Sequence, residues 1–117
     1  MRVIVIGAGE VGSNIAESLA DSHDVVVIDI DGDRVEQLTY SLDVLAIEGD
    51  GTDLTVLEEA DVEAADILIA STDDDESNIL ACSTSKLAGE AFTIARVKDR
   101  KFFDTWRRQR GAFGVDF

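Results

Sequence analysis

The feature that most constrains this chain is a set of three glycines between a strand and a helix. Residues 2–6 form a β-branched apolar run too short for a helix, and the sequence GAGEVG follows at residues 7–12. From residue 10 the apolar side chains take the spacing of an amphipathic helix. A buried strand, a G-x-G-x-x-G turn and a helix, in this order, predict the first half of a dinucleotide-binding βαβ unit.

Each glycine has a separate expected task. Gly7 allows the tight turn, Gly9 lets the backbone approach a pyrophosphate, and Gly12 lets the helix pack closely on the strand. The helix that begins there would offer free N–H groups and the positive end of its dipole to phosphates. The alternative is a βαβ turn of the same shape that binds nothing.

Strand-like and helix-like segments alternate along the rest of the chain. Such alternation specifies right-handed βαβ units, so the predicted fold class is α/β, a Rossmann-type doubly wound parallel sheet with helices on both faces. The sequence has no proline and no low-complexity linker, so residues 1–117 are expected to form a single domain. Strands are expected at residues 24–29, 44–48, 67–71 and 92–97, and helices at residues 31–41, from residue 52 or 53, and at residues 74–87.

An acidic residue ends the second expected strand at the position that selects the ribose. Asp29 follows Gly7 by 22 residues, close to the spacing of about 20 found in dinucleotide-binding units. A carboxylate there accepts hydrogen bonds from ribose hydroxyls and repels a 2′-phosphate, which favours NAD(H) over NADP(H). Arg34 weakens the predicted preference for NAD(H) over NADP(H), because a basic side chain shortly after the acid can turn toward a ribose phosphate. The alternative for Asp29 is a solvated carboxylate at the end of a strand.

The other expected strand ends are also polar or glycine, and they meet at the edge where such sheets bind ligands. Asp50 would accept from an adenine amino group, whereas Thr72 and Asp73 either close over the ribose and phosphate or serve ordinary turn chemistry. Asn78 is expected to face the ligand or water, and Arg96 to pair with phosphates or with neighbouring carboxylates. The candidate cofactor-binding residues are Gly7, Ala8, Gly9, Glu10, Val11, Gly12, Asp29, Ile30, Arg34, Gly49, Asp50, Gly51, Ser71, Thr72, Asp73, Asn78 and Arg96.

Composition excludes several other classes of protein. No apolar stretch reaches the roughly 18 residues that cross a bilayer, so direct membrane insertion is not expected. The single cysteine, Cys82, rules out an internal disulfide, and with His23 as the one histidine no metal site is expected. Cys82 sits among apolar helix positions and is expected to be buried and inert, and His23 precedes the second strand, away from the ligand edge. We therefore expect no catalytic residues and no metal ligands.

The net charge of −15 excludes binding to nucleic acid backbones and is unevenly distributed. Residues 1–95 carry 22 acidic and 3 basic side chains, whereas residues 96–110 carry 7 basic and 2 acidic ones. The acids are mostly Asp and the bases mostly Arg, a composition that resembles proteins from salt-loaded cytoplasms. We expect a halophilic source, because at about 1 M salt the Debye length is about 3 Å and the self-repulsion is screened. An ordinary acidic protein is the alternative.

The last segment differs from the alternating part. Phe102, Phe103 and Trp106 share one side of an expected basic helix, and they form either a dimer surface or, as we favour, part of the core. Residues 115–117 have the pattern of the start of a sixth strand, which predicts that the chain is a fragment of a longer polypeptide.

Five segments together resemble the N-terminal domain of Trk-type potassium-uptake regulatory subunits, the RCK nucleotide-binding family. They extend beyond the generic glycine loop and follow one another in order over about residues 1–100. The segments are RVIVIGAGEVG at 2–12, VVID at 26–29, IEGDGT at 47–52, ASTDDDESN at 70–78 and IARV at 94–97.

The resemblance implies a cytoplasmic regulatory domain, not an enzyme, that binds NAD(H), or ATP and ADP as in related members. It implies a membrane potassium transporter or channel as partner and assembly into homodimers or larger rings. Related ATP-responsive domains often have an arginine in the glycine loop, where this chain has Glu10. The rival interpretation is the cofactor-binding half of an NAD-dependent dehydrogenase. Ligand contacts implied by the resemblance are Gly7, Gly9, Glu10, Val11, Gly12, Asp29, Gly49, Asp50, Thr72, Asp73 and Arg96.

Overall fold

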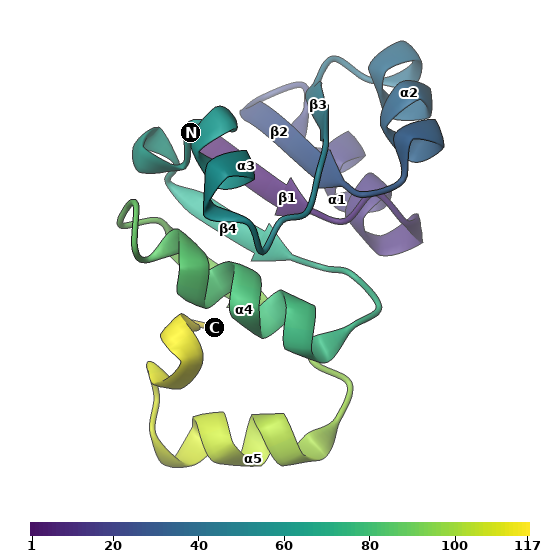
Figure 1. Ribbon diagram of the computed structural model, residues 1–117. Coiled ribbons are helices and arrows are strands. Elements are labelled where there is room, and N and C mark those ends of the chain that lie inside the picture. The colour runs from purple at the N-terminus through teal and green to yellow at the C-terminus, as the bar shows by residue number, and fades with distance from the viewer.

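The computed structural model describes residues 1–117 as a five-stranded parallel sheet with helices on both faces (Figure 1). The strand order is β3-β2-β1-β4-β5, and all neighbouring strands pair in parallel. This arrangement confirms the predicted doubly wound sheet. The strands are β1 (Arg2–Ile6), β2 (Asp24–Asp29), β3 (Leu45–Glu48), β4 (Ile67–Ala70) and β5 (Phe92–Ala95). The helices are α1 (Glu10–Leu19), α2 (Gly32–Ser41), α3 (Leu54–Glu59), α4 (Asp75–Ser85) and α5 (Arg100–Arg108), with 3₁₀ turns η1 (Val62–Ala64) and η2 (Ala112–Gly114).

The side chains of the central strand β1 pack alternately into two separate hydrophobic cores. Val3 and Val5 point to the face covered by α1 and α2, where seven buried residues form one cluster. Ile4 and Ile6 point to the opposite face, where α3, η1 and α4 complete a cluster of 14. Burial on both faces explains why β1 is a continuous apolar run, because neither side of this strand meets water.

Aspartate residues fix the start of four of the five α-helices. In each case the carboxylate accepts a hydrogen bond from a backbone N–H of the first turn, which satisfies one of the donors that a helix leaves free. The expected start of the third helix at residue 52 or 53 is thereby resolved, because Asp53 is its N-cap. The N-caps are Asp31 for α2, Asp53 for α3, Asp74 for α4 and Asp99 for α5.

The C-terminal segment does not contain the expected sixth strand as a regular element. Residues 112–114 form η2, and residues 116 and 117 instead pair through their backbone with the edge of β5. The N–H of Phe117 donates to the carbonyl of Thr93, and its carbonyl accepts from Ala95, which is the pattern of a parallel pair. No helix in the structure has both the length and the apolar composition needed to span a membrane.

The aromatic side of α5 joins the core only in part. Trp106 packs against the larger cluster, and its indole N–H donates to the carbonyl of Val115 at 2.8 Å. Phe103 remains exposed, and α5 has no fully buried residue. The favoured placement in the core therefore applies to Trp106 but not to Phe103.

Candidate functional site

The candidate site lies where the chain leaves the central strands in opposite directions. After β1 the sheet continues on one side through β2 and β3 and on the other through β4 and β5. In open α/β sheets the crevice at such a switch point is the usual ligand site. Here it contains two adjoining cavities of about 270 and 330 Å³, which share Gly7, Asp29, Arg34, Thr72 and Asp73 in their walls.

The glycine loop has the geometry that its sequence predicts. Gly7 has a φ of +107°, a conformation that side chains disfavour, so the tight turn needs a glycine. A Cβ on Gly12 would lie 1.8 Å from the carbonyl oxygen of Gly7, so only glycine allows this helix to sit so close to β1. A Cβ on Gly9 would meet only the Nη1 of Arg34, at 3.5 Å, an ordinary contact. The protein itself therefore leaves open space at Gly9.

Helix α1 begins without the cap that the other α-helices have. Its N-cap residue is Gly9, which has no side chain to accept a hydrogen bond. The N–H groups of Glu10, Val11 and Gly12 have no acceptor in the chain, and the first helical bond is donated by the N–H of Ser13 to the carbonyl of Gly9. Glu10 and Val11 line the larger cavity. Free N–H groups and the positive end of the helix dipole thus face this cavity, an arrangement that suits an anion.

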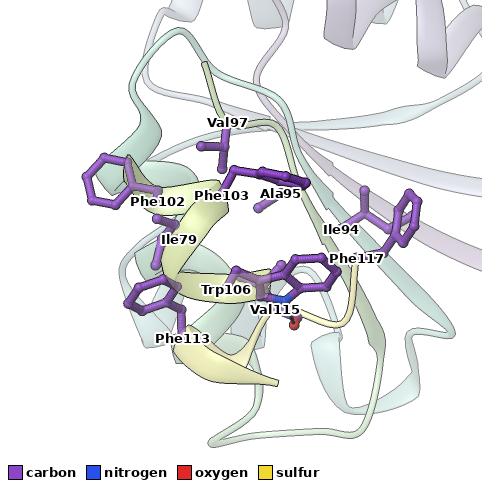
Figure 2. A pocket seen from close by; sticks show the side chains of 10 residues that line it. All are labelled: Ile79, Ile94, Ala95, Val97, Phe102, Phe103, Trp106, Phe113, Val115 and Phe117. Carbon is purple, nitrogen blue, oxygen red and sulfur yellow. Dashed lines mark hydrogen bonds between the residues drawn. The ribbon is translucent and has the colours of Figure 1, made fainter. Parts of the chain in front are cut away.

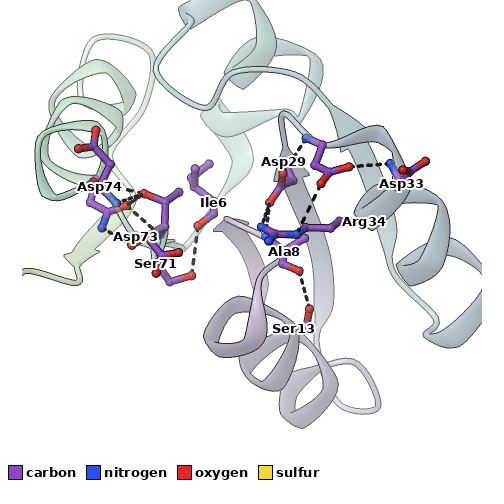
Figure 3. A network of polar contacts seen from close by, with 12 residues as sticks. Ile6, Ala8, Ser13, Asp29, Asp33, Arg34, Ser71, Asp73 and Asp74 are labelled. Atoms are coloured by element: carbon purple, nitrogen blue, oxygen red, sulfur yellow. Dashed lines mark hydrogen bonds and ion pairs between the residues drawn. The ribbon is translucent and has the colours of Figure 1, made fainter.

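Asp29 ties the glycine loop to the turn after β2. Its carboxylate accepts from the N–H of Ala8 at 2.6 Å and from the N–H of Asp31 at 2.7 Å, and the residue is only 9% exposed (Figure 3). Each oxygen keeps a further lone pair, and Asp29 lines both cavities. It is therefore a structural anchor as well as a candidate ribose acceptor, and the solvated alternative is wrong.

Arg34 lines both cavities and lies beside two carboxylates. Its guanidinium is 3.9 Å from the carboxylate of Asp29 and 3.7 Å from that of Asp31, and the side chain is half exposed (Figure 3). Two carboxylates thus surround one guanidinium. A 2′-phosphate at this position would meet a surplus of negative charge, which supports the predicted preference against NADP(H).

The loop after β3 forms the far wall of the smaller cavity. The N–H and hydroxyl of Thr52 donate to the carboxylate of Asp50 at 2.9 and 2.7 Å, and these bonds hold the pKa of Asp50 below its usual value. Gly49 and Gly51 pack so closely on Val56 and Ile6 that a Cβ on either would clash. The exposed side chain of Ile30 completes this wall.

The loop after β4 forms the opposite wall with the end of β5. The hydroxyl of Ser71 donates to the carbonyl of Ile6 at 3.1 Å, which holds this loop against β1. Arg96 is 3.4 Å from the exposed carboxylate of Asp73, so the alternative in which it pairs with a neighbouring carboxylate describes the structure. Arg96 still lines the larger cavity and keeps its remaining donors.

Asn78 faces neither the ligand cavities nor water, so both expectations for it are wrong. It is fully buried, and its carboxamide bonds to Thr72 and to the carbonyl of Arg96. This polar side chain near the start of a helix therefore finds its hydrogen-bond partners inside the protein. Nothing in the local sequence distinguishes such a residue from one that meets a ligand, because Arg96, its partner directly after β5, is 18 residues away.

Fourteen of the seventeen candidate residues line one or both cavities, and Ala8, Gly12 and Asn78 do not. Ala8 and Gly12 shape the glycine loop from behind. The sequence interpretation missed Thr52, Asp74 and Ser77, which also line the smaller cavity. Their signal was their position at the start of a predicted helix, at the edge of the sheet where the strands end.

The two other residues considered for chemistry lie away from the site. Burial raises the pKa of the Cys82 thiol to about 12, so it stays protonated at neutral pH, as expected for an inert core position. His23 lies in the turn before β2, at the opposite edge of the sheet. No group of three or more His, Cys, Asp or Glu side chains is arranged to hold a metal ion.

A third cavity, of about 260 Å³, lies between α5 and the edge of the sheet and is lined by apolar side chains alone (Figure 2). Trp106, Phe103 and Phe117 form part of its wall. Its lining offers no charged side chain for a nucleotide. Its position beyond β5 also separates it from the glycine loop.

The sequence comparisons connect the chain to one family. The sequence profile of the TrkA-N domain family matches residues 3–116. The chain is 42% identical over 104 residues to a Trk system potassium uptake protein TrkA homolog of Archaeoglobus fulgidus, covering 89% of this chain and 24% of that protein. A Pyrococcus abyssi TrkA homolog is 36% identical over 120 residues, covering 98% and 53%. The chain therefore spans only about a quarter to a half of the length of these relatives.

Solved structures confirm the fold at lower sequence identity. The TrkA-N domain of the inner membrane protein ybaL from Escherichia coli has a TM-score of 0.85 at 22% identity, over 98% of this chain and 83% of that one. The GsuK channel bound to NAD has a TM-score of 0.82 at 23% identity, over 97% and 20%. GsuK bound to ADP has the same score and identity, over 98% and 30%. At these identities the likeness establishes the Rossmann-type architecture.

Proposed function

Because the chain belongs to the TrkA-N domain family, we propose that it is the nucleotide-binding regulatory domain of a potassium-uptake system, with NAD(H) as its ligand. The observation that carries this proposal is the start of α1. It is the α-helix without an aspartate cap, and its free N–H groups face a cavity beside a glycine that the protein's own packing does not require. A phosphate group would supply the missing acceptors.

The two cavities fit the two halves of a dinucleotide. The smaller cavity, between the ends of β2 and β3, would take the adenosine, with its ribose hydroxyls on Asp29 and its adenine near Asp50. The pyrophosphate would pass Gly9 and the start of α1. The larger cavity continues to Thr72 and Arg96, where the second nucleotide would lie. A mononucleotide such as ATP or ADP would use the first part of the same path.

Binding would regulate a partner by favouring one of two conformations or assemblies. A ligand shifts such an equilibrium only by its difference in affinity for the two states. We propose that occupancy changes the relative placement of paired domains, and that a membrane potassium transporter or channel subunit on the cytoplasmic side senses this change. Homodimers or larger rings would provide the pairing. The named relatives, potassium uptake proteins, support this partner class.

Calorimetric titration at high salt with NADH, NAD⁺, NADPH, ATP and ADP tests the proposal. We expect NADH or NAD⁺ to bind at one site per chain and NADPH to bind at least tenfold more weakly. Asp29→Ala should weaken NADH binding more than its control, Asp31→Ala. Both side chains lie near Arg34, but only Asp29 is buried against the glycine loop. If the titration detects no heat of binding for any of the five nucleotides, the proposal is refuted.

Solution scattering tests the regulatory step separately. We expect the distance distribution of the assembled domain to change between the ligand-free, NADH-bound and ATP-bound forms. The same distribution in all three forms would contradict regulation through domain placement. Steady oxidation of NADH by added carbonyl substrates would instead favour the dehydrogenase alternative.

A further inference from the structure

Asn78 is a fully buried polar side chain whose hydrogen-bonding capacity is completely used. Its Oδ1 accepts from the N–H of Thr72 at 2.9 Å and from the Thr72 hydroxyl at 2.6 Å. Its Nδ2 donates to the carbonyl of Thr72 at 3.0 Å and to the carbonyl of Arg96 at 2.8 Å. A carboxamide has two acceptor sites and two donors, so all four are satisfied. Burial of such a group is costly unless every bond is made.

The two segments that Asn78 joins both line the larger cavity. Thr72 and Arg96 both line it, and they follow β4 and β5. Thr72 also lies against the tight turn of the glycine loop, because a Cβ on Gly7 would be 3.2 Å from its Cγ2. One carboxamide that itself lines neither cavity thus bonds to both Thr72 and Arg96, in addition to the bond from the N–H of Arg96 to the carbonyl of Ala70.

Asp75, one turn earlier on α4, extends the same connection. Its carboxylate accepts from the N–H of Lys98 at 2.9 Å and from the N–H of Asp99 at 2.7 Å. These bonds hold the pKa of Asp75 below its usual value. Asp99 is in turn the N-cap of α5. Side chains of the first turns of α4 thus hold the whole segment between β5 and α5.

We propose that Asn78 is a positioning residue of the nucleotide site, which fixes the Thr72 loop and Arg96 at the separation that the ligand requires. This inference rests on the proposed function for its ligand. With Asp75, it makes the loop after β4, the start of α4 and residues 96–99 one unit. A ligand that displaces the Thr72 loop must then move the start of α5 as well.

Two substitutions of Asn78 separate positioning from simple destabilisation. Asn78→Leu keeps the approximate volume and loses all four bonds. Asn78→Asp also loses both donated bonds when ionised, and it then places a negative charge against the carbonyl oxygens of Thr72 and Arg96. Protonation of the carboxyl restores one donor. Burial and these carbonyls raise the pKa of the carboxyl in Asn78→Asp, so lowering the pH favours its protonated form.

The binding experiment measures NADH affinity of the wild type and both variants at pH 8 and at pH 5.5. At pH 8 we expect both variants to bind at least tenfold more weakly than the wild type. At pH 5.5, with each variant compared with the wild type at the same pH, Asn78→Asp should recover most of this loss and Asn78→Leu should not. Wild-type affinity in both variants, or equal losses at both pH values, would overturn the proposal.

Hydrogen exchange of the ligand-free protein tests the connection without any ligand. The control is Thr93→Val, which removes a buried hydroxyl bonded to Gly114 at the other end of β5. With both variants brought to equal global stability by urea, Asn78→Leu should lower the protection of Thr72, Lys98 and Asp99 amides at least tenfold more than Thr93→Val does. Equal protection at these amides would refute the connection. Failure of the wild type to bind NADH would refute the proposed function, whereas the exchange result would still decide whether Asn78 couples the Thr72 loop to residues 96–99.

Discussion

Replacing Gly9 by alanine should separate ligand binding from folding. Gly9 has a φ of −72° and a ψ of −165°, a conformation that alanine adopts without strain. An added Cβ would contact only the guanidinium of Arg34, at 3.5 Å, and that side chain is half exposed and free to move. Alanine is a poorer N-cap than glycine, but it also restricts the unfolded chain, and these effects of about 0.5 to 1 kcal/mol each oppose one another. The free energy of unfolding should therefore change by less than about 1 kcal/mol.

The same methyl group should weaken binding strongly. It would stand in the wall of the cavity that Gly9 and Arg34 line, directly before the free N–H groups of α1. A phosphate that must withdraw from these donors loses charge-assisted hydrogen bonds, each contributing about 1.5 to 3 kcal/mol. Loss of one such bond corresponds to about a tenfold or greater rise in the NADH dissociation constant.

Urea denaturation and calorimetric titration of the same samples measure the two effects, with Gly12→Ala as the matched control. A Cβ on Gly12 would lie 1.8 Å from the Gly7 carbonyl oxygen, so the backbone must shift at a cost of about 3 kcal/mol or more. Gly9→Ala should thus fold but bind poorly, whereas Gly12→Ala should fold poorly. Unchanged NADH affinity in a well-folded Gly9→Ala variant would refute the assigned path of the pyrophosphate.

Three further predictions concern charge. Asp29→Ala leaves one buried and one partly buried N–H donor unpaired and should lower the free energy of unfolding by about 3 kcal/mol in urea titrations. Loss of the exposed cap in Asp31→Ala should lower it by about 1 kcal/mol, and equal losses would contradict the anchoring role. Raising NaCl from 0.1 to 1 M should raise the melting temperature, because the Debye length falls from about 10 to about 3 Å around a chain of net charge −15. The NADH affinity should stay constant or rise over the same range. A lower melting temperature at 1 M NaCl would count against a salt-adapted surface. Because its folded pKa is lowered, Asp75 contributes stability that is present above its ordinary pKa of 3.8 and is lost as the pH falls through the folded value. Asp75→Asn should therefore have a lower melting temperature than the wild type at pH 7, and the two melting temperatures should converge as the pH falls below 3.8. A constant difference as the pH is lowered would refute this cause.

Features with local causes could be predicted from the sequence. The glycine loop and the strands depend on neighbouring residues, because turn conformation, β-branched runs and helical spacing are encoded over a few positions. The same holds for the aspartates that begin α2 to α5, each of which bonds within three residues of itself. Asp29 was also found from its spacing to Gly7, although its bond to Ala8 was not.

Features that depend on distant partners could not be predicted in this way. Asn78 has the sequence context of a ligand-facing helix start, and only its contact with the carbonyl of Arg96 shows that it is buried. Residues 115–117 have the apolar pattern of a strand, but η2 precedes them and only residues 116 and 117 pair with β5. Phe103 and Trp106 share one side of α5 but differ in burial, because the sheet edge beside them leaves a hollow.

Mapping of amide chemical shifts during an NADH titration tests the central claim most directly. If the uncapped start of α1 receives the pyrophosphate, the amides of Glu10 and Val11 should show the largest shifts, accompanied by those of Ala8 and Thr72. Amides that line the apolar hollow beside Trp106 should shift little. Shifts centred on that hollow, with Glu10 and Val11 unchanged at saturation, would contradict the assignment of the nucleotide site.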